Sequence, residues 1–318
     1  MAVIFAYFGQ IGNAVFIVCS AWFLIDDDKF KLSKVISIIL DCLVISVMML
    51  CIFLAFGYSF SIKMIIRQFM PTILGTNWFV TTYLIFYTIH PYINRVIHSI
   101  SQREHLCINL VLFVFYCIGA LIKGSLLYFN KLLGFIVLYS FVAYMKKYMK
   151  TFTESKKANT GLLAISIVGL LLMILLTNAM GIYIPFLRNR VTLWCKFWNP
   201  VIIAIAISAF NLSSAKVYSN KTVNYLSSLS LLVLCFHANP LVLLYFRYDF
   251  FEYIFVEYSY QRLVAWMLAF AAFLAIVSIL LSCLYKGTIQ KLTYKLGQKY
   301  SNYGELLFLR IYNRVEKN

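Results

Sequence analysis

Long apolar runs recur along this chain. Runs of about 20 mostly apolar residues, the length that an α-helix needs to cross a bilayer, follow one another as far as residue 285. Hydrophobic residues make up 63% of the sequence and charged residues 12%, whereas a soluble domain is about half apolar and about a quarter charged. Because backbone groups in lipid must be hydrogen-bonded within the protein, the sequence predicts an all-α fold, a polytopic bundle of transmembrane helices.

The apolar pattern divides into about nine candidate spans with short connections and no separate soluble domain. A weakly amphipathic stretch at 60–74 is expected to lie at the membrane interface. We therefore expect one membrane domain over residues 1–285, followed by a basic tail at 286–318. The expected spans lie at residues 3–25, 35–57, 77–94, 106–123, 127–145, 160–182, 197–214, 224–246 and 262–285.

The formal net charge of +17 comes from 28 Lys and Arg residues against 11 Asp and Glu residues. Most of the basic residues lie in one alternate set of connections, which the positive-inside rule places in the cytoplasm. The C-terminus is then cytoplasmic and Met1 lies outside, an arrangement that a missing preceding helix would explain. Since the charge follows membrane topology and no basic-aromatic groove is visible, we do not expect nucleic-acid binding.

Several familiar catalytic and metal-binding patterns are absent from the sequence. The eight cysteines are isolated, without a C-x-x-C pair, so they indicate neither a disulfide framework nor a zinc site. There is no glycine-rich phosphate loop, no H-E-x-x-H and no G-x-S-x-G. His90, His98 and His105 are too far apart to share one helical face as close ligands, so no metal is expected.

Polar residues inside apolar runs are the candidates for chemistry, because a polar group in a bilayer is costly. His237 lies near the middle of its expected span, ahead of Asn239 and Pro240. It either faces a cavity or is hydrogen-bonded to a neighbouring helix. Asp41 is the only carboxylate inside an expected span, about two turns from the cytoplasmic end of its helix, and we favour a hydrogen-bonded side chain over a catalytic one.

His90 lies late in an aromatic-rich run and is followed at once by Pro91, with Arg95 five residues further on. Tyr83 and Tyr87 share roughly its helical face. These residues form either a cationic mouth for an anionic ligand or an interfacial aromatic belt whose Arg reaches toward the headgroups.

Two basic segments also have two readings. Lys31 and Lys34 are one helical turn apart, and they either hold the phosphates of a molecule such as coenzyme A or only enforce the topology. In the tail, Ile289, Leu292 and Leu296 follow helical spacing, which fits a basic helix lying on the inner leaflet. A solvated tail is the alternative.

Four motifs in order resemble the integral-membrane acyltransferase-3 family, whose members O-acylate cell-envelope polysaccharides and related acceptors. The likeness covers most of the chain, and its specificity comes from the order and spacing of the motifs rather than from any one of them. They are the Gly-rich run 9–24 with Phe16 and Ser20, the basic pair Lys31 and Lys34, the Trp-Phe-x-x-x-Tyr pattern from Trp78 to Tyr83 followed by Tyr87 and Pro91, and the late run 227–237 ending in His237.

The resemblance implies transfer of an acyl group, acetyl by default, from acyl-CoA to a hydroxyl of a cell-surface polysaccharide or its lipid-linked precursor. It implies a multi-pass protein of a bacterial-type plasma (inner) membrane. Lys31, Lys34 and Arg95 would hold the phosphates of coenzyme A. Ser20, Trp78, Tyr83 and His90 would line the cavity, and His237 would be a secondary catalytic candidate.

The sequence departs from the family pattern at several points. Ala21 replaces the usual Gly after Ser20, and Ala238 follows His237 where an acidic residue is common. Family members usually have ten spans, and their first helix carries an Arg about three turns ahead of a His that is regarded as catalytic. The present sequence begins at what looks like the second helix, so no residue here inherits that role.

Three other functions stay open at this point. One is an inactive acyltransferase that lacks its first helix. Another is a non-enzymatic transporter or flippase of saccharide precursors, for which the sequence shows no paired repeats or broken helices. The last is a polysaccharide polymerase or ligase, for which a large outside connection would be expected.

Overall fold

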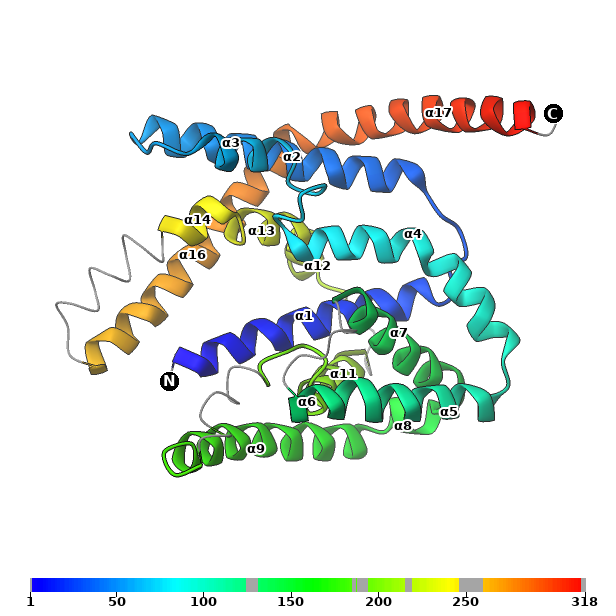
Figure 1. Cartoon of the computed structure of the whole chain (residues 1–318), viewed down its shortest axis with the longest axis vertical. Coiled ribbons are helices and arrows are strands. Elements are labelled where there is room, and N and C mark those ends of the chain that lie inside the picture. Colours follow the sequence, from blue (N-terminus) through cyan, green and yellow to red (C-terminus); the bar gives the residue numbers. More distant parts are fainter. Residues whose placement is uncertain are drawn as a thin grey trace. The chain divides into compact units, whose positions relative to one another are not determined.

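The computed structural model describes residues 2–123, 131–184, 187, 194–214, 219–245 and 260–315 (Figure 1). Every regular element in this part of the chain is a helix, and no strand occurs in it. The expected all-α fold is therefore confirmed. The chain divides into two compact units, and helix α4 (Trp78–Ser99) runs from one unit into the other.

The first unit comprises Met1–Phe30 and Ile85–Tyr218. Helix α1 packs against α7 and α11, and α11 packs against α9. Buried aromatic residues such as Phe86, Phe135 and Tyr139 form its core. Besides the second part of α4, its elements are α1 (Ala2–Leu24), α5 (Gln102–Leu112), the π-helix η1 (Phe113–Ile118), α6 (Gly119–Lys123), α7 (Lys131–Tyr148), α8 (Lys150–Glu154), α9 (Lys156–Met180) and α11 (Pro200–Ser214).

The second unit comprises Lys31–Leu84 and Ser219–Asn318. Its central element is α2, which packs against α17, α13 and α3. Besides the start of α4, its elements are α2 (Leu32–Ala55), α3 (Ile62–Phe69), α12 (Lys221–Ser227), α13 (Ser230–His237), α14 (Pro240–Tyr245), α16 (Tyr260–Thr288) and α17 (Gln290–Val315).

Five helices of the described residues are long and apolar enough to cross a membrane. Each overlaps an expected span, and Pro200–Ser214 is a shorter apolar helix within another. The interfacial stretch expected at 60–74 contains the short helix α3. The five long stretches are Ala6–Leu24, Leu32–Ala55, Gln102–Ile122, Lys156–Met180 and Val264–Thr288.

The segment 224–246 differs from our expectation of one continuous span. Its described residues form parts of α12, then α13 and α14, which are separated by turns at Ser228 and Asn239. Pro240 has no backbone N–H and starts α14, where that group would have no helical partner in any case. The side-chain oxygen of Asn239 accepts from the N–H of Leu241 at 2.9 Å. Polar residues and a proline therefore break what hydropathy alone predicts as one helix.

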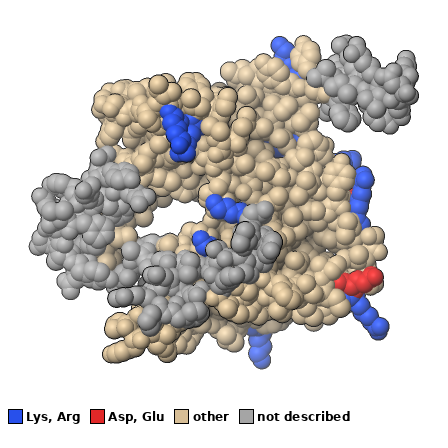
Figure 2. Space-filling model, viewed as in Figure 1, with Lys and Arg blue, Asp and Glu red and all other residues tan. Residues whose placement is uncertain are grey.

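The exposed faces of the long helices are apolar. On α16, Phe273, Ile276, Leu280 and Leu284 recur at helical spacing and are all more than half exposed. On α9, Ile165 is 73% exposed. Figure 2 shows a face covered mostly by uncharged residues, with Lys and Arg as separate points. A surface of this kind would be a liability in water and is matched by lipid, so the chain is a multi-pass membrane protein.

The basic tail forms one long helix, α17, that packs along α2. Its contact face carries the buried residues Thr293, Gly297 and Ser301. A Cβ added at Gly297 would overlap the Ser37 hydroxyl and lie 3.1 Å from the Ser33 carbonyl oxygen. Glycine therefore permits this close approach. Lys295 and Lys299 lie on the exposed face of α17, and its position on the inner leaflet stays a prediction.

Candidate functional site

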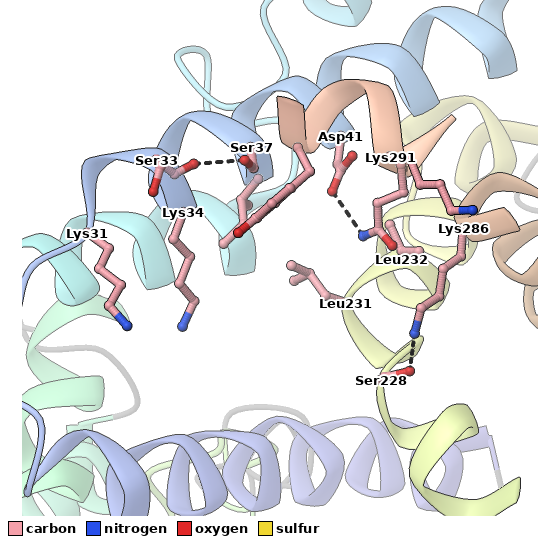
Figure 3. Close-up of a pocket in the computed structure, with 13 residues that line it drawn as sticks. Lys31, Ser33, Lys34, Ser37, Asp41, Ser228, Leu231, Leu232, Lys286 and Lys291 are labelled. Atoms are coloured by element: carbon pink, nitrogen blue, oxygen red, sulfur yellow. Dashed lines mark hydrogen bonds between the residues drawn. The ribbon is translucent and has the colours of Figure 1, made fainter. Parts of the chain in front are cut away.

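A cavity of about 650 Å³ lies within the second unit, beside the first turns of α2 (Figure 3). We call it the lysine cavity, because four lysines from two separate parts of the sequence line it. Its volume lies in the range typical of small-molecule sites. It is lined by Lys31, Ser33, Lys34, Ser37, Ile38, Asp41, Ser228, Leu231, Leu232, Lys286, Gln290, Lys291 and Tyr294.

The first two lysines come from the start of α2. Lys31 is the residue before the helix and Lys34 lies in its first turn, so both side chains project from the same end of α2. Figure 3 shows them extending side by side into the cavity. Both residues are exposed. The structure therefore brings together the two lysines that the sequence suggested as phosphate ligands.

The other two lysines come from the junction of α16 and α17. Lys286 is half-buried, its ammonium group lies 4.8 Å from the centre of the Tyr225 ring, and it donates a hydrogen bond to the hydroxyl of Ser228. Lys291 follows in the first turn of α17 and is exposed. Lys286 is thus held by named partners, which lowers the entropy that it loses when an anion binds.

Asp41 lies at the wall of the lysine cavity and is the only acidic residue among those that line it. It is buried, and its carboxylate accepts hydrogen bonds from the Tyr285 hydroxyl at 2.9 Å, from the Thr293 hydroxyl at 2.6 Å and from the Gln290 amide at 3.3 Å. These three donors fix the α16–α17 junction to α2. Our interpretation of Asp41 as a hydrogen-bonded side chain agrees with this geometry.

The balance of charge in the lysine cavity favours an anion. Four lysines and one carboxylate line the cavity, and that carboxylate already accepts three hydrogen bonds. Lysine binds phosphate as a point charge. The hydroxyl group of Ser33 adds a neutral donor, whereas Leu231 and Leu232 give the cavity an apolar wall. The arrangement suits a ligand that carries both phosphate groups and an apolar part.

His90 belongs to the first unit and is fully buried. Pro91 has no N–H for the carbonyl oxygen of Tyr87, four residues before it, and Nδ1 of His90 lies 2.5 Å from that oxygen. Its Nε2 lies 2.9 Å from the carbonyl oxygen of Asp27. Both ring nitrogens thus lie against backbone carbonyl oxygens, and the tautomer decides which of the two oxygens accepts the ring N–H. These contacts support α4 at Pro91 and the segment that follows α1, and contact of His90 with a ligand stays a prediction.

Further polar contacts, centred on the buried residues Asn94 and Tyr139, hold the same segment after α1. Asn94 donates to the carbonyl oxygen of Leu24 at 2.9 Å and to the carboxylate of Asp28 at 2.9 Å, and it accepts from the Tyr139 hydroxyl at 2.5 Å. Lys146 forms an ion pair with Asp26 at 2.5 Å. Helices α4 and α7 thus fix the acidic segment after α1, close in sequence to Lys31.

The remaining predicted residues occupy different surroundings. Arg95 is exposed, with its guanidinium 5.4 Å from the centre of the Tyr92 ring. Ser20 is half-buried on α1 in the first unit, whereas Trp78 is half-buried and Tyr83 is buried in the second. None of these four lines the lysine cavity. Their proposed contact with substrate stays a prediction.

His237 ends α13 and is half-buried. Its Nδ1 lies 2.8 Å from the carbonyl oxygen of Val233, so a proton on Nδ1 bonds within the helix and leaves the lone pair on Nε2. Asn239 and Pro240 line a small cavity of about 10 Å³ together with Asn77 and Cys42. That volume is about one water molecule at most, so this part of the cavity expected near His237 is too small for a substrate.

Sequence reasoning missed Lys286 and Lys291 as site residues and treated them only as part of a basic tail. A local signal did exist. Gly297 lies one to two turns beyond Lys291, and a glycine inside a helix often marks close approach of another backbone. The sequence could not show that α2 is the helix that approaches.

One comparison with known proteins agrees with the order of the motifs and with the all-helical fold. The model of the acyltransferase domain of the acyltransferase-3 family matches residues 1–285, which is most of the chain. The chain belongs to this family of membrane acyltransferases. No curated protein and no solved structure matches it.

Proposed function

We propose that this protein transfers an acyl group, acetyl by default, from acyl-CoA to a hydroxyl of a cell-surface polysaccharide or of its lipid-linked precursor. The family supports acyl transfer in a membrane. The lysine cavity is the observation that supports acyl-CoA as the donor, because it joins Lys31 and Lys34 to further cationic groups around a volume of about 650 Å³. The phosphates of the donor bind there.

The proposed reaction breaks the thioester bond of the donor. The acceptor hydroxyl oxygen attacks the acyl carbonyl carbon, a general base takes the hydroxyl proton, and the C–S bond breaks. The thiolate of coenzyme A leaves and is protonated, so ester and free thiol are the products. His237 is a secondary candidate for the base, since its Nε2 carries the lone pair when Nδ1–H bonds to Val233.

The topology fits a cytoplasmic donor. With the C-terminus in the cytoplasm, as the distribution of Lys and Arg predicts, the start of α2 and the α16–α17 junction face the compartment that supplies acyl-CoA. The resemblance to the family, rather than the charge distribution, supports a bacterial-type plasma membrane as its location. A surface saccharide or its lipid-linked precursor would then meet the acyl group from within the bilayer or from its outer side.

The test uses membranes that contain the protein and acetyl-CoA with a radiolabelled acetyl group. It measures the label transferred to saccharide and the free thiol released from coenzyme A. We expect base-labile label in the saccharide. Lys31→Gln with Lys34→Gln raises the apparent KM for acetyl-CoA about tenfold or more, because charge-assisted contacts to phosphate are lost. Lys156→Gln with Lys157→Gln, two exposed lysines at the start of α9, is the matched control and leaves KM unchanged.

Two results would contradict parts of this proposal. Thiol release and label transfer that are the same with and without the protein would exclude acyl transfer from CoA. A His237→Ala variant that retains full label transfer would exclude His237 as the base while leaving the donor site intact.

A further inference from the structure

The lysine cavity has two cationic ends. Lys31 and Lys34 form one end, and Lys286 with the Ser228 hydroxyl forms the other. Figure 3 shows Leu231 between these two groups. A ligand with a single phosphate would need only one of the ends. Two ends with an apolar wall between them indicate a ligand whose anionic groups are separated by an uncharged part.

We propose that the α16–α17 junction supplies a second phosphate site, in which Lys286 and Lys291 bind an anionic group distinct from the one at Lys31 and Lys34. The cavity then selects a nucleotide that carries phosphate on both sides of its ribose. This inference concerns how the protein selects its acyl donor, and it rests on the proposed function. Both lysines lie beyond residues 1–285, so the match to the family does not extend to them.

The α16–α17 junction, which carries Lys286 and Lys291, is fixed to α2 by side chains other than these two lysines. Asp41 accepts from Tyr285, Gln290 and Thr293, residues that flank both lysines in sequence. The approach of α17 to α2 at Gly297 fixes the start of α17 from the other side. The junction is thus held at two points, so Lys286 and Lys291, which both line the cavity, belong to a braced corner of the fold rather than to a free tail.

The ligand chemistry follows from this spacing. Coenzyme A carries a pyrophosphate on one side of its ribose and a 3′-phosphate on the other, with adenine attached. Lys31 and Lys34 bind one of these groups, the α16–α17 lysines bind the other, and Leu231 and Leu232 contact the uncharged part. Removal of the 3′-phosphate leaves one anionic group, so a cavity with two cationic ends discriminates against 3′-dephospho-coenzyme A.

The experiment measures the dissociation constants of coenzyme A and of 3′-dephospho-coenzyme A for the purified full chain in lipid nanodiscs. We expect the wild-type protein to bind coenzyme A about tenfold more tightly than the dephospho form, because one charge-assisted contact set is missing. Lys286→Gln with Lys291→Gln reduces this ratio toward one. Lys299→Gln, on the exposed face of α17, is the matched control and keeps the ratio.

The outcomes separate the inference from the proposed function. A ratio that stays at the wild-type value in the Lys286→Gln, Lys291→Gln protein would overturn the second phosphate site, as would equal binding of the two probes by the wild-type protein. In both cases binding that depends on Lys31 and Lys34 would still support the donor site. Failure of the wild-type protein to bind coenzyme A at all would overturn the inference and the donor assignment together. The salt dependence of binding, shallower in the double variant, gives a second readout that does not depend on activity.

Discussion

The hydroxyl of Thr293 donates a 2.6 Å hydrogen bond to the carboxylate of Asp41, across 252 positions of sequence. Thr293 is in the first turns of α17 and Asp41 is in α2, so this contact joins the tail to the helix that carries Lys34. The Tyr285 hydroxyl donates to the same oxygen at 2.9 Å. Because the carboxylate has three donors around it, the geometry of the lysine cavity depends on this one acidic residue.

Asp41→Asn should loosen the junction of α16 and α17. The amide oxygen could still accept from the Tyr285 and Thr293 hydroxyls, which share one carboxylate oxygen, but the amide NH2 would replace the oxygen that accepts from Gln290, so that hydrogen bond is lost. We expect a loss of about 1–3 kcal/mol in the free energy of unfolding. Thermal denaturation in detergent measures it. Glu154→Gln, which removes an exposed partner of Lys150, is the control and should change stability little. An Asp41→Asn protein as stable as the wild type would contradict the role given to Asp41.

Gly297→Ala should weaken the packing of α17 on α2. The added methyl group would overlap the hydroxyl of Ser37, which donates to the Ser33 carbonyl oxygen at 2.8 Å. Overpacking of this kind costs about 1–3 kcal/mol. Ser37→Ala removes the overlapping atom, so the double variant should be more stable than the sum of the single effects predicts. Gly169→Ala, where nothing lies within 4 Å of the new group, should be neutral or stabilising. Additive effects of Gly297→Ala and Ser37→Ala would contradict the contact.

His90→Ala should destabilise the first unit, because the ring N–H that one of the carbonyl oxygens of Tyr87 and Asp27 accepts is lost, together with the packing of a fully buried ring. The expected cost is about 1–3 kcal/mol, since both groups lie at a buried site. Pro91→Ala restores a backbone N–H that can reach Tyr87, so it should recover part of the loss in the double variant. Denaturation of the single and double variants measures this recovery. A Pro91→Ala change that only adds to the damage would show that the Tyr87 carbonyl oxygen was not the group in need of a donor.

The exposed face of α9 should tolerate apolar residues of any size but no charge. Leu172 is exposed on this face, within the apolar stretch Lys156–Met180. Leu172→Lys should lower membrane integration by about 2–3 kcal/mol on an insertion scale, whereas Leu172→Ala should change it little. The fraction of chain that resists extraction from membranes by alkaline carbonate measures the effect. Equal integration of the two variants would mean that this face of α9 does not contact lipid.

Local hydropathy was sufficient to predict most of the helices. Helices α1, α2, α9 and α16 coincide with expected spans within a few residues, because a spanning helix is encoded in its own apolar run. The break at 238–239, between α13 and α14, was missed for the same reason. Asn239 and Pro240 cause this turn, but the residues around them are apolar. Two residues change the mean hydropathy of a long window very little, so the average still predicts one helix.

The candidate site was predicted only in part. Lys31 and Lys34 are one turn apart in a local motif, so their association is visible in sequence. Lys286 and Lys291 join them only because α17 folds back on α2 through Asp41 and Gly297, a long-range pairing that periodicity does not encode. For His90 the sequence could not separate two roles, because a buried polar residue that contacts the backbone has the same sequence signature as one that contacts a ligand.

The most direct test of the account is to find where the donor binds. A photoreactive acyl-CoA analogue is cross-linked to the full chain in membranes, and the labelled peptides are identified by mass spectrometry with and without excess coenzyme A. The account predicts label that coenzyme A competes away in peptides around Lys34, Leu231 and Lys291, the walls of the lysine cavity. Competed label confined to peptides that contribute nothing to that cavity would contradict the claim that it is the donor site.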